Sequence, residues 1–503
     1  MKLYNTYTKK LEEFKPIRKG EVRLYHCGPT VYWTQHIGNL RGMFCADLAV
    51  RVFRYLDYEV KHVRNYTDVG HLTSDEDEGE DKMEKRARLE KLKPEEIAEK
   101  YIKIFEQDTQ ELNMLEPNVK PKATEHIQEM IGMVQSLLDK GYAYSTDLAV
   151  YFDISKAKNY TKLSGQILEK NIQGAGKSEV SDLQKKHSSD FALWFFKAGA
   201  HKNALQHWPS PFNSKLVENG RGFPGWHIEC SAMSKKYLGN TLDIHMGGIE
   251  HIPVHHTNEI AQSESANGVK FTNYWLHNEH LLVNNKKMAK SEGTGYSLSE
   301  IKEKGFNPLS LRYLFLTAHY RSKLNFTWKS LEASENALNR LCDFVSFMRE
   351  FHSPNEAERS EAVEPKMQDL HMRCHSPAET MAPSDENERS SASYRKLSFY
   401  EEKFQNALEN NFDTPKALAI IWEMIKSKEL SYENKKTALL KFDKVLGLGL
   451  DKITTKEIKI SDEVKKLIEQ REEARGNKDW ERADELREEI KKSGHIFEDK
   501  PIG

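Results

Sequence analysis

Four residues with the chemistry of zinc ligands are widely spread along the chain: Cys27, Cys230, His255 and Glu259. His255 and Glu259 are four residues apart, so they would share one face of a helix. Two thiols, an imidazole and a carboxylate suit Zn²⁺ in softness and in number. Because buried free cysteines are also common in protein cores, the spacing alone leaves a metal site and ordinary packing both open.

A second group of residues could bind phosphate. The segment 27–39 contains a Gly-Pro turn between a predicted strand and a predicted helix. Helix N-termini bind phosphates because they present free N–H groups and partial positive charge. His36 and Asn39 would add side-chain donors there, and Gly38 would allow a ligand close to the backbone. An ordinary helix cap explains the same residues, so the motif needs further support.

A third group consists of Lys287 and Lys290 on a segment that continues to Gly293 and Gly295. Two lysines on such a loop could close over a polyphosphate and neutralise the charge that develops as pyrophosphate leaves. The alternative is a solvated basic turn without a function.

In order and separation, the second and third groups resemble the HIGH and KMSKS motifs of class I aminoacyl-tRNA synthetases. In that class the first motif binds the ATP phosphates, and the second stabilises the transition state of amino-acid adenylation. Asn39 stands where the first motif has its second histidine, and Ala289 stands where the second motif has its central serine. Asn39 keeps a hydrogen-bond donor and Ala289 leaves both lysines in place, so catalysis is expected to be intact.

Four further segments resemble cysteinyl-tRNA synthetases in particular: residues 25–32, 225–233, 243–248 and 255–262. The resemblance covers nearly the whole chain except 352–393 and parts of 195–220. It implies that Cys27, Cys230, His255 and Glu259 hold one zinc ion, which accepts the thiolate of the substrate cysteine as an additional ligand. Met246 and Glu250 differ from the more usual Gly and Asp of that family.

The same resemblance implies roles for individual residues. Catalysis is expected from His36, Asn39, Lys287 and Lys290; ATP binding from Gly38, Asp243, Gly247, Gly248 and Lys290; amino-acid binding from Gly28, Thr67, Trp226 and His245; and tRNA binding from Trp480 and Arg487. The implied reaction joins cysteine to ATP as cysteinyl-adenylate and then transfers it to the 3′ end of the cognate tRNA. Zn²⁺ and Mg²⁺, the latter with ATP, are the expected cofactors.

The zinc ion would also explain selectivity. Serine is nearly the size of cysteine, and differences of this kind in a shaped pocket yield only about 1–3 kcal/mol. Because a thiolate is a far better zinc ligand than an un-ionised hydroxyl, no separate editing domain is expected.

The composition limits the possible settings for this chemistry. The 75 basic and 77 acidic residues give a net charge of −2, so a nucleic-acid surface must be a local patch. Five widely separated cysteines argue against a disulfide framework and favour a reducing cytoplasm. No run approaches the roughly 20 apolar residues of a membrane span. We therefore expect a cytoplasmic protein with no membrane partner. A monomer is also expected.

The hydrophobic pattern predicts the opening of a parallel nucleotide-binding sheet: a strand at 23–26, a helix after His36 and a strand at 60–66. From Thr124 the pattern changes to an amphipathic helix that ends at Gly141, followed by short strands at 142–144 and 149–152. A strand at 242–245 predicts that the sheet resumes. Charged, helical sequence covers 73–103.

The predicted fold class is α/β, with a Rossmann-like catalytic domain that carries an insertion, then an α-helical domain and a small mixed C-terminal tail. The predicted boundaries are 1–115 and 216–296 for the catalytic domain, 116–215 for the insertion, 297–351 for a helical stem-contact region, 352–393 for a flexible linker, 394–460 for a helical bundle and 461–503 for an anticodon-binding tail. The linker is rich in Ser, Pro, Glu and Asn without apolar periodicity. In the bundle, Asp413-Thr414-Pro415 predicts a helix start. The tail reads as two helices, 464–475 and 479–492.

Three other interpretations share parts of this pattern. A cysteine ligase that acts on an amino sugar would use the same zinc and adenylation residues, but the long helical C-terminal region argues against it. The pair His227 and Glu229 resembles the His-x-Glu of zinc nucleobase deaminases, although no Pro-Cys-x-x-Cys follows. A non-catalytic tRNA-binding relative is disfavoured because His36, Lys287, Lys290 and the four ligand candidates are all present.

Overall fold

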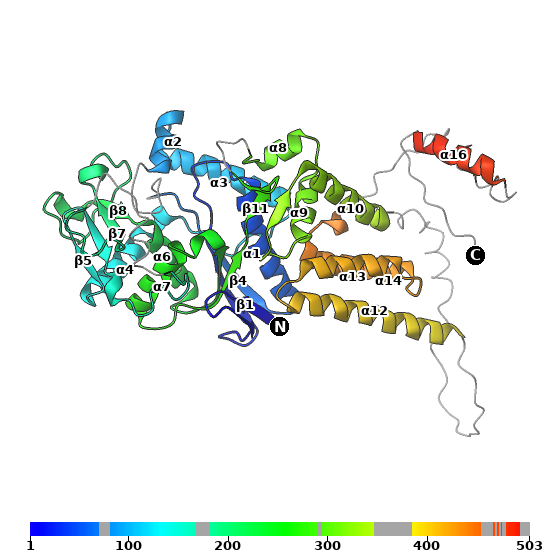
Figure 1. The fold of residues 1–503 in the computed structure, drawn as a ribbon, viewed down its shortest axis with the longest axis horizontal. Helices are drawn as coiled ribbons and strands as arrows, with labels where there is room; N and C mark the ends of the chain where they lie inside the picture. The colour runs from blue at the N-terminus through cyan, green and yellow to red at the C-terminus, as the bar shows by residue number, and fades with distance from the viewer. Residues whose placement is uncertain are drawn as a thin grey trace, which may run out of the picture. The chain divides into compact units, whose positions relative to one another are not determined.

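The structure is a computed structural model that describes residues 1–69, 81–166, 182–288, 294–346, 385–453, 466–467, 470–471, 474 and 479–492. The chain divides into two compact units, 1–344 with 368–451 and 345–367 with 452–503 (Figure 1). Within the described ranges, none of the helices combines the length and the apolar character that crossing a bilayer requires.

The first unit is built around a four-stranded parallel sheet in the order β10-β9-β3-β4. Its strands are β3 (Glu21–His26), β4 (Glu59–Arg64), β9 (Leu242–Gly248) and β10 (Thr272–Asn278). Helix α1 (Ile37–Tyr55) joins β3 to β4, as the sequence predicts. Because the strands are parallel, their carboxyl ends meet at one edge, where ligands bind in open α/β sheets.

The insertion between β4 and β9 folds into a second sheet, antiparallel, in the order β5-β6-β7-β8. Its strands are β5 (Ala143–Ser145), β6 (Ala149–Phe152), β7 (Phe191–Phe196) and β8 (Gly222–Pro224). Helix α4 (Ile127–Asp139) precedes them, and Gly141 follows it with a positive φ of 73°. Strand β8 lies beyond the predicted end of the insertion at residue 215. It has only three residues, which is too few to show a periodic pattern in the sequence.

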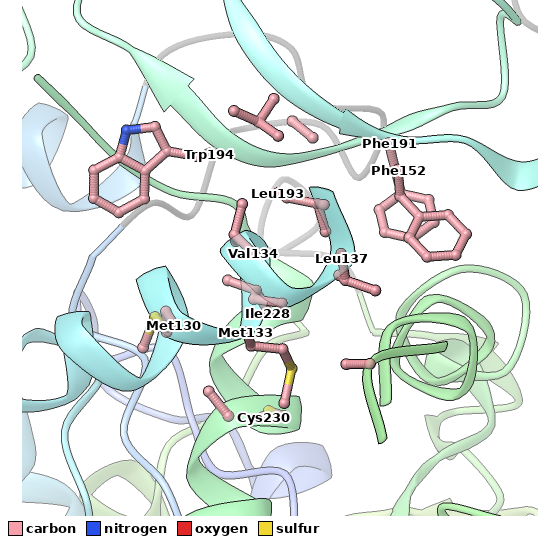
Figure 2. Packing of buried hydrophobic residues seen from close by; sticks show 14 of the residues in the cluster. Met130, Met133, Val134, Leu137, Phe152, Phe191, Leu193, Trp194, Ile228 and Cys230 are labelled. Carbon is pink, nitrogen blue, oxygen red and sulfur yellow. The ribbon is translucent and has the colours of Figure 1, made fainter. Parts of the chain in front are cut away.

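Two helices next to the central sheet carry the functional segments. Helix α6 (Trp226–Leu238) leads from β8 to β9, and α7 (His255–Asn267) leads from β9 to β10. Ile228 of α6 packs with α4 and β7 in the hydrophobic core of the insertion, and Figure 2 shows Cys230 further along the same helix. The core of the insertion and the central sheet therefore share α6.

Beyond β10 the chain forms a small sheet and several helices. Strands β11 (Leu281–Val283), β12 (Lys286–Lys287) and β13 (Leu324–Phe326) pair in the order β12-β11-β13. Helices α8 (Leu298–Glu303), α9 (Pro308–Leu316) and α10 (Trp328–Ser346) belong to the same region. Strand β12, which carries Lys286 and Lys287, pairs with β11, the strand that follows β10 in the chain.

The helical domain consists of α12 (Asp385–Glu409), α13 (Thr414–Lys426) and α14 (Tyr432–Leu446), side by side in Figure 1. The predicted helix start is confirmed, because Asp413 caps α13 by accepting from the Lys416 amide. Helix α12 begins inside the predicted linker, and residues 352–384 of that linker lie outside the described residues.

The remaining elements are short or peripheral. Strands β1 (Lys2–Asn5) and β2 (Lys10–Glu13) form a hairpin. The charged segment predicted at 73–103 contains α2 (Lys82–Glu90) and the first part of α3 (Pro94–Glu111), which continues beyond it. Lys91, with a positive φ, separates the two helices. In the second unit, α16 (Trp480–Lys492) confirms the second tail helix; the first falls mostly outside the described residues.

Candidate active site

The four predicted metal ligands converge at the carboxyl edge of the central sheet. Cys27 follows β3, Cys230 lies on α6, and His255 and Glu259 share one face of α7. All four side chains are buried, and their donor atoms lie within 4.8 Å of one another. The helical spacing of His255 and Glu259 brings Nε2 of the first to 3.1 Å from Oε1 of the second.

The donor set fits a zinc ion in chemistry and in size. Cys27 Sγ lies 3.9 Å from Cys230 Sγ and 3.7 Å from Glu259 Oε1. A tetrahedral zinc ion with bonds of about 2.3 Å to sulfur separates two such atoms by roughly 3.8 Å. The two sulfur atoms are therefore already spaced as ligands of one ion.

Ionisation of these groups follows from their burial and from one another. Burial opposes the thiolate of Cys230, but hydrogen bonding to Cys27 and His255 lowers its pKa to about 6. Burial also opposes the charged form of His255, yet Glu259 and Cys230 raise its pKa to about 10. Burial would raise the pKa of Glu259, but His245 and His255 hold it far below its ordinary value. A thiolate, a carboxylate and the imidazolium of His255 are thus buried together, and a bound divalent cation would take the place of the His255 proton.

Two histidines around the cluster, His256 and His277, are absent from the predicted site. His256 and the predicted amino-acid contact His245 form an alternative donor set with Cys27 and Glu259. His256 Nδ1 lies 2.7 Å from His277 Nε2, at the carboxyl end of β10. The repeated histidine at 255–256 and the histidine near the end of a strand are the sequence signals that could have revealed them.

His227 and Glu229, which resemble part of a deaminase motif, contact different residues. His227 Nδ1 lies 3.0 Å from His255 Nδ1 and so orients that ring, as a second group behind a metal ligand commonly does. Glu229 instead accepts a hydrogen bond from Thr67 Oγ1 at 2.9 Å. The two side chains therefore do not act together on one ion.

Thr67 and Gly28, both predicted to bind the amino acid, are linked through Asn65 just beyond the ends of β3 and β4. The Gly28 amide donates to Asn65 Oδ1 at 2.9 Å, and Asn65 Nδ2 donates to Thr67 Oγ1 at 3.3 Å. A Cβ on Gly28 would collide with the carbonyl oxygen of Asn65, so only glycine fits. Burial, followed by the charge of Cys230, raises the pKa of Glu229 well above its ordinary value.

Trp226 and His245, the other two predicted amino-acid contacts, lie against the metal ligands. The ring of Trp226 stacks on His255 with centroids 4.4 Å apart and is partly exposed, so one part of it faces outward. His245 is fully buried, and its Nε2 lies 2.8 Å from Glu259 Oε2. His245 therefore orients the carboxylate of a candidate ligand.

The structure brings the two predicted ATP motifs together. His36 caps α1, and its Nδ1 accepts a hydrogen bond from the Asn39 amide at 3.1 Å. The Ile37 amide donates to the carbonyl of Tyr296, which follows the lysine loop, at 2.8 Å. A Cβ on Gly38 would collide with the methyl group of Met288. The first turn of α1 and the segment around Met288 are therefore direct neighbours.

The lysines of the second motif are only partly described. Lys287 lies in β12 and is exposed. Lys290 lies outside the described residues. Asn39 is exposed at the first turn of α1, so its side chain is accessible to a ligand at the helix N-terminus.

Gly247 and Gly248 end β9 at the same edge of the sheet as the candidate metal ligands. Asp243 does not belong with them. It lies near the amino end of β9, where Oδ1 accepts from the Ile17 amide at 2.6 Å and Oδ2 from the Arg23 amide at 2.9 Å. Both carboxylate oxygens of Asp243 bind backbone amides. This arrangement does not support the predicted contact of Asp243 with ATP.

Trp480 and Arg487, the predicted tRNA contacts, both lie on α16 of the second unit. The side chain of Trp480 is 52% exposed, which leaves an aromatic face for stacking. Arg487 lies 3.5 Å from Asp484, one turn earlier on the helix, and its side chain is also largely exposed.

Two known protein families match this chain, one over the catalytic region and one over the C-terminal tail. Residues 13–336 match the family described as tRNA synthetases class I (C) catalytic domain. Residues 459–501 match the family described as cysteinyl-tRNA ligase anticodon binding domain. The first match spans more than half of the chain and contains every candidate metal ligand and both ATP motifs.

Similar proteins extend over the full length. The cysteine–tRNA ligase of Treponema denticola is 42% identical and covers 99% of this chain and 98% of its own. Cysteine–tRNA ligase 1 of Burkholderia lata is 40% identical, covering 100% of this chain and 95% of its own.

Two solved structures share the fold at low identity. Methionyl-tRNA synthetase of Mycobacterium tuberculosis, bound to methionyl-adenylate, superposes with a TM-score of 0.53 at 12% identity, covering 87% of this chain and 92% of its own. LeuRS of Agrobacterium radiobacter K84, in a complex with tRNA, gives 0.56 at 13% identity, covering 88% and 85%. The predicted class I fold is confirmed. With its family matches and full-length relatives, the chain belongs to the cysteine–tRNA ligase family of the class I aminoacyl-tRNA synthetases.

Proposed function

We propose that the protein is a cysteine–tRNA ligase that activates cysteine with ATP and transfers it to the 3′ end of its cognate tRNA. The observation that carries the proposal is the convergence of Cys27, Cys230, His255 and Glu259 beside an ATP-type helix N-terminus. A site built from soft ligands next to a phosphate-binding motif selects a substrate that has both a zinc-binding group and a group to be activated. Cysteine combines a thiol with a carboxylate.

The four side chains would hold one Zn²⁺ per chain. When bound, the ion supplies a Lewis acid that binds a thiolate far better than an un-ionised hydroxyl, and so separates cysteine from serine. The residues of the chain do the rest of the selection. Trp226 covers His255 on one side, and His227 and His245 hold His255 and Glu259 in orientation. These contacts fix the ligands before the substrate arrives.

Activation would take place at the first turn of α1. The substrate carboxylate attacks the α-phosphate of ATP, which is bound with Mg²⁺, and pyrophosphate leaves as cysteinyl-adenylate forms. The N-terminus of α1, with His36 and Asn39, would bind the phosphates. Gly38 would allow their close approach, and Gly247 and Gly248 would face the nucleotide. Lys287 and Lys290 would neutralise the charge on the departing pyrophosphate.

The second step needs the tRNA. The cysteine would be transferred from the adenylate to the terminal ribose, through the 2′-hydroxyl by analogy with class I enzymes. Trp480 would stack on an anticodon base, and Arg487 would contact the backbone. One chain supplies every proposed ligand, so we expect a monomer. The described cysteines are free thiols, which fits the reducing cytoplasm.

The test is exchange of pyrophosphate into ATP, driven by cysteine or by serine, followed by charging of total tRNA. We expect exchange with cysteine and not with serine, and cysteine transferred to tRNA. Exchange without transfer would favour the ligase that acts on an amino sugar. Absence of exchange in zinc-replete protein would contradict the proposal and favour a non-catalytic relative.

A further inference from the structure

A chain of hydrogen bonds runs from the end of β3 to the first turns of α6. The Gly28 amide donates to Asn65, Asn65 donates to the Thr67 hydroxyl, and Thr67 donates to Glu229 Oε2. Asn65, Thr67 and Glu229 are buried, with exposed fractions of 1%, 3% and 0%. Such a buried chain gives each polar group a fixed donor or acceptor role.

The role of the Thr67 hydroxyl follows from a count of its bonding positions. A hydroxyl has one proton and two lone pairs. Glu229 takes the proton, and Asn65 Nδ2 donates to one lone pair. What remains on Thr67 is a single lone pair, which can only accept. Any ligand group that meets this oxygen must therefore be a donor.

Glu229 adds a second indication of a donor ligand. Its other oxygen, Oε1, is buried and has no hydrogen-bond partner among the described residues. A buried oxygen without a partner is costly, and a donor group of a ligand would satisfy it. This carboxylate lies beside Cys230 in sequence, and Asn65 Oδ1 lies 3.8 Å from Cys230 Sγ. The chain of hydrogen bonds thus borders the site where we place the substrate sulfur.

We propose that Glu229 is a positioning residue that fixes the Thr67 hydroxyl as an acceptor for the α-ammonium group of the amino acid. The inference rests on the proposed function, in which the sulfur of the substrate cysteine binds the ion that Cys27 and Cys230 help to hold. Two carbon atoms separate that sulfur from the ammonium nitrogen, so the ammonium group must lie next to the metal ligands. The ammonium group is a pure donor, which matches both the free lone pair of Thr67 and the unpartnered Oε1 of Glu229.

The test compares cysteine with 3-mercaptopropionate, which keeps the thiol and the carboxylate but lacks the ammonium group. Dissociation constants are measured by calorimetry for zinc-loaded wild type, Glu229→Gln, Thr67→Val and the double variant, and zinc content is measured in each. The amide that Glu229→Gln introduces can donate to Thr67 and turn the hydroxyl proton toward the ligand. Ser231→Ala is the matched control, because Ser231 lies on the same helix, is buried and bonds to Gln262 instead.

We expect Glu229→Gln and Thr67→Val each to weaken cysteine binding about tenfold to a hundredfold, the loss of a charge-assisted hydrogen bond. Binding of 3-mercaptopropionate and zinc content should stay unchanged, and the double variant should be no worse than the weaker-binding single variant. Equal losses for both ligands would overturn the proposal, because they would mark Glu229 as purely structural. Unchanged cysteine binding would also overturn it. Failure of the wild type to bind or activate cysteine would instead remove the proposed function itself.

Discussion

Asp47 and Arg312 form an ion pair of 2.6 Å in which the side chains are 3% and 0% exposed. Asp47 lies in α1, whose first turn carries the proposed phosphate-binding residues, and Arg312 lies in α9. Arg312 also donates to the carbonyls of Leu446, at the end of α14, and Leu112. The buried side chain of Arg312 therefore connects the helical domain to α1, the helix that His36 caps.

Removal of this tie should be costly. Burial opposes the charge of Asp47, but Arg312 and Arg51 outweigh it and lower the pKa of the carboxyl group. We expect Arg312→Ala to reduce the free energy of unfolding by about 3–5 kcal/mol, because it leaves a buried charge short of partners. Lys403→Ala is the control: it breaks an exposed pair with Glu423 and should cost about 0–1 kcal/mol. Urea denaturation of the two variants measures the difference, and equal midpoints would contradict the assignment.

Substitution of one candidate ligand should remove the metal without unfolding the chain. Cys230→Ser replaces a thiolate by a hydroxyl that does not ionise, so zinc affinity should fall by more than about 100-fold. Zinc content by mass spectrometry after dialysis against a chelator is the measurement. Cys342→Ser serves as the control, since Cys342 is outside the described donor sets. Full zinc occupancy in Cys230→Ser would contradict this prediction and would favour the second donor set, which contains His245 and His256 in place of Cys230 and His255.

The glycine after Cys27 should be irreplaceable, whereas one in α4 should not. A Cβ at Gly28 meets the backbone of Asn65, so Gly28→Ala must displace the end of β3 and should cost about 1–3 kcal/mol. A Cβ at Gly132 meets nothing within 4 Å, and Gly132→Ala should add about 0.5–1 kcal/mol of stability in the helix. Thermal unfolding with and without cysteine distinguishes them. A Gly28→Ala protein with normal stability and zinc content would refute the close approach.

Neighbouring lysines in β12 should differ in function. Lys287 pairs with Leu282 and Lys286 with Val283, so the two side chains leave the strand on opposite sides. We expect Lys287→Ala to slow ATP–pyrophosphate exchange by about 10²–10³-fold, as removal of a transition-state donor does, with zinc content unchanged. Lys290→Ala, at a position outside the described residues, should behave alike. Lys286→Ala is the matched control, and an equal loss in that variant would argue for a general charge effect.

Acid sensitivity should depend on one buried histidine in β4. Burial, and then the charge of Arg64, lowers the pKa of His62 to about 3. Between pH 6.5 and 3 the unfolded chain binds a proton that the folded chain does not, so His62 removes stability as the pH falls, by roughly 1.4 kcal/mol per pH unit. From pH 7 to pH 5, His62→Leu should lose about 2 kcal/mol less than wild type. Urea denaturation at both pH values tests this, and identical pH dependence would contradict it.

The site was predictable where each residue borders a recognisable element. Cys27 follows an apolar strand, and the spacing of His255 and Glu259 fits one helical face, so their local placement follows from periodicity. That Cys27 meets Glu259 is implied by the resemblance and not by any local pattern, and the pairing of β3 with β9 is known only from the structure. The sequence alone predicts the elements of this site better than their pairing.

The failures have physical causes. The resemblance implies that Asp243 faces the nucleotide together with Gly247, but a strand rises about 3.3 Å per residue and separates the two residues by roughly 13 Å. Strand β7 was not predicted because all six of its residues are apolar and buried, which leaves no alternation. His256 and His277 pack like core residues, and their pairing depends on the register of β10 and the rotation of α7. The start of α12 at Asp385 was hidden by a polar composition that resembles a linker.

Three consecutive residues of α6 face three different surroundings. Ile228 enters the hydrophobic interior of the insertion, Glu229 bonds to Thr67, and Cys230 faces Cys27. The inserted sheet is accordingly no appendage that could be trimmed away. If it fails to fold, α6 loses its packing against the insertion. We then expect the proposed amino-acid site to be lost as well, although the insertion contains none of the four candidate metal ligands.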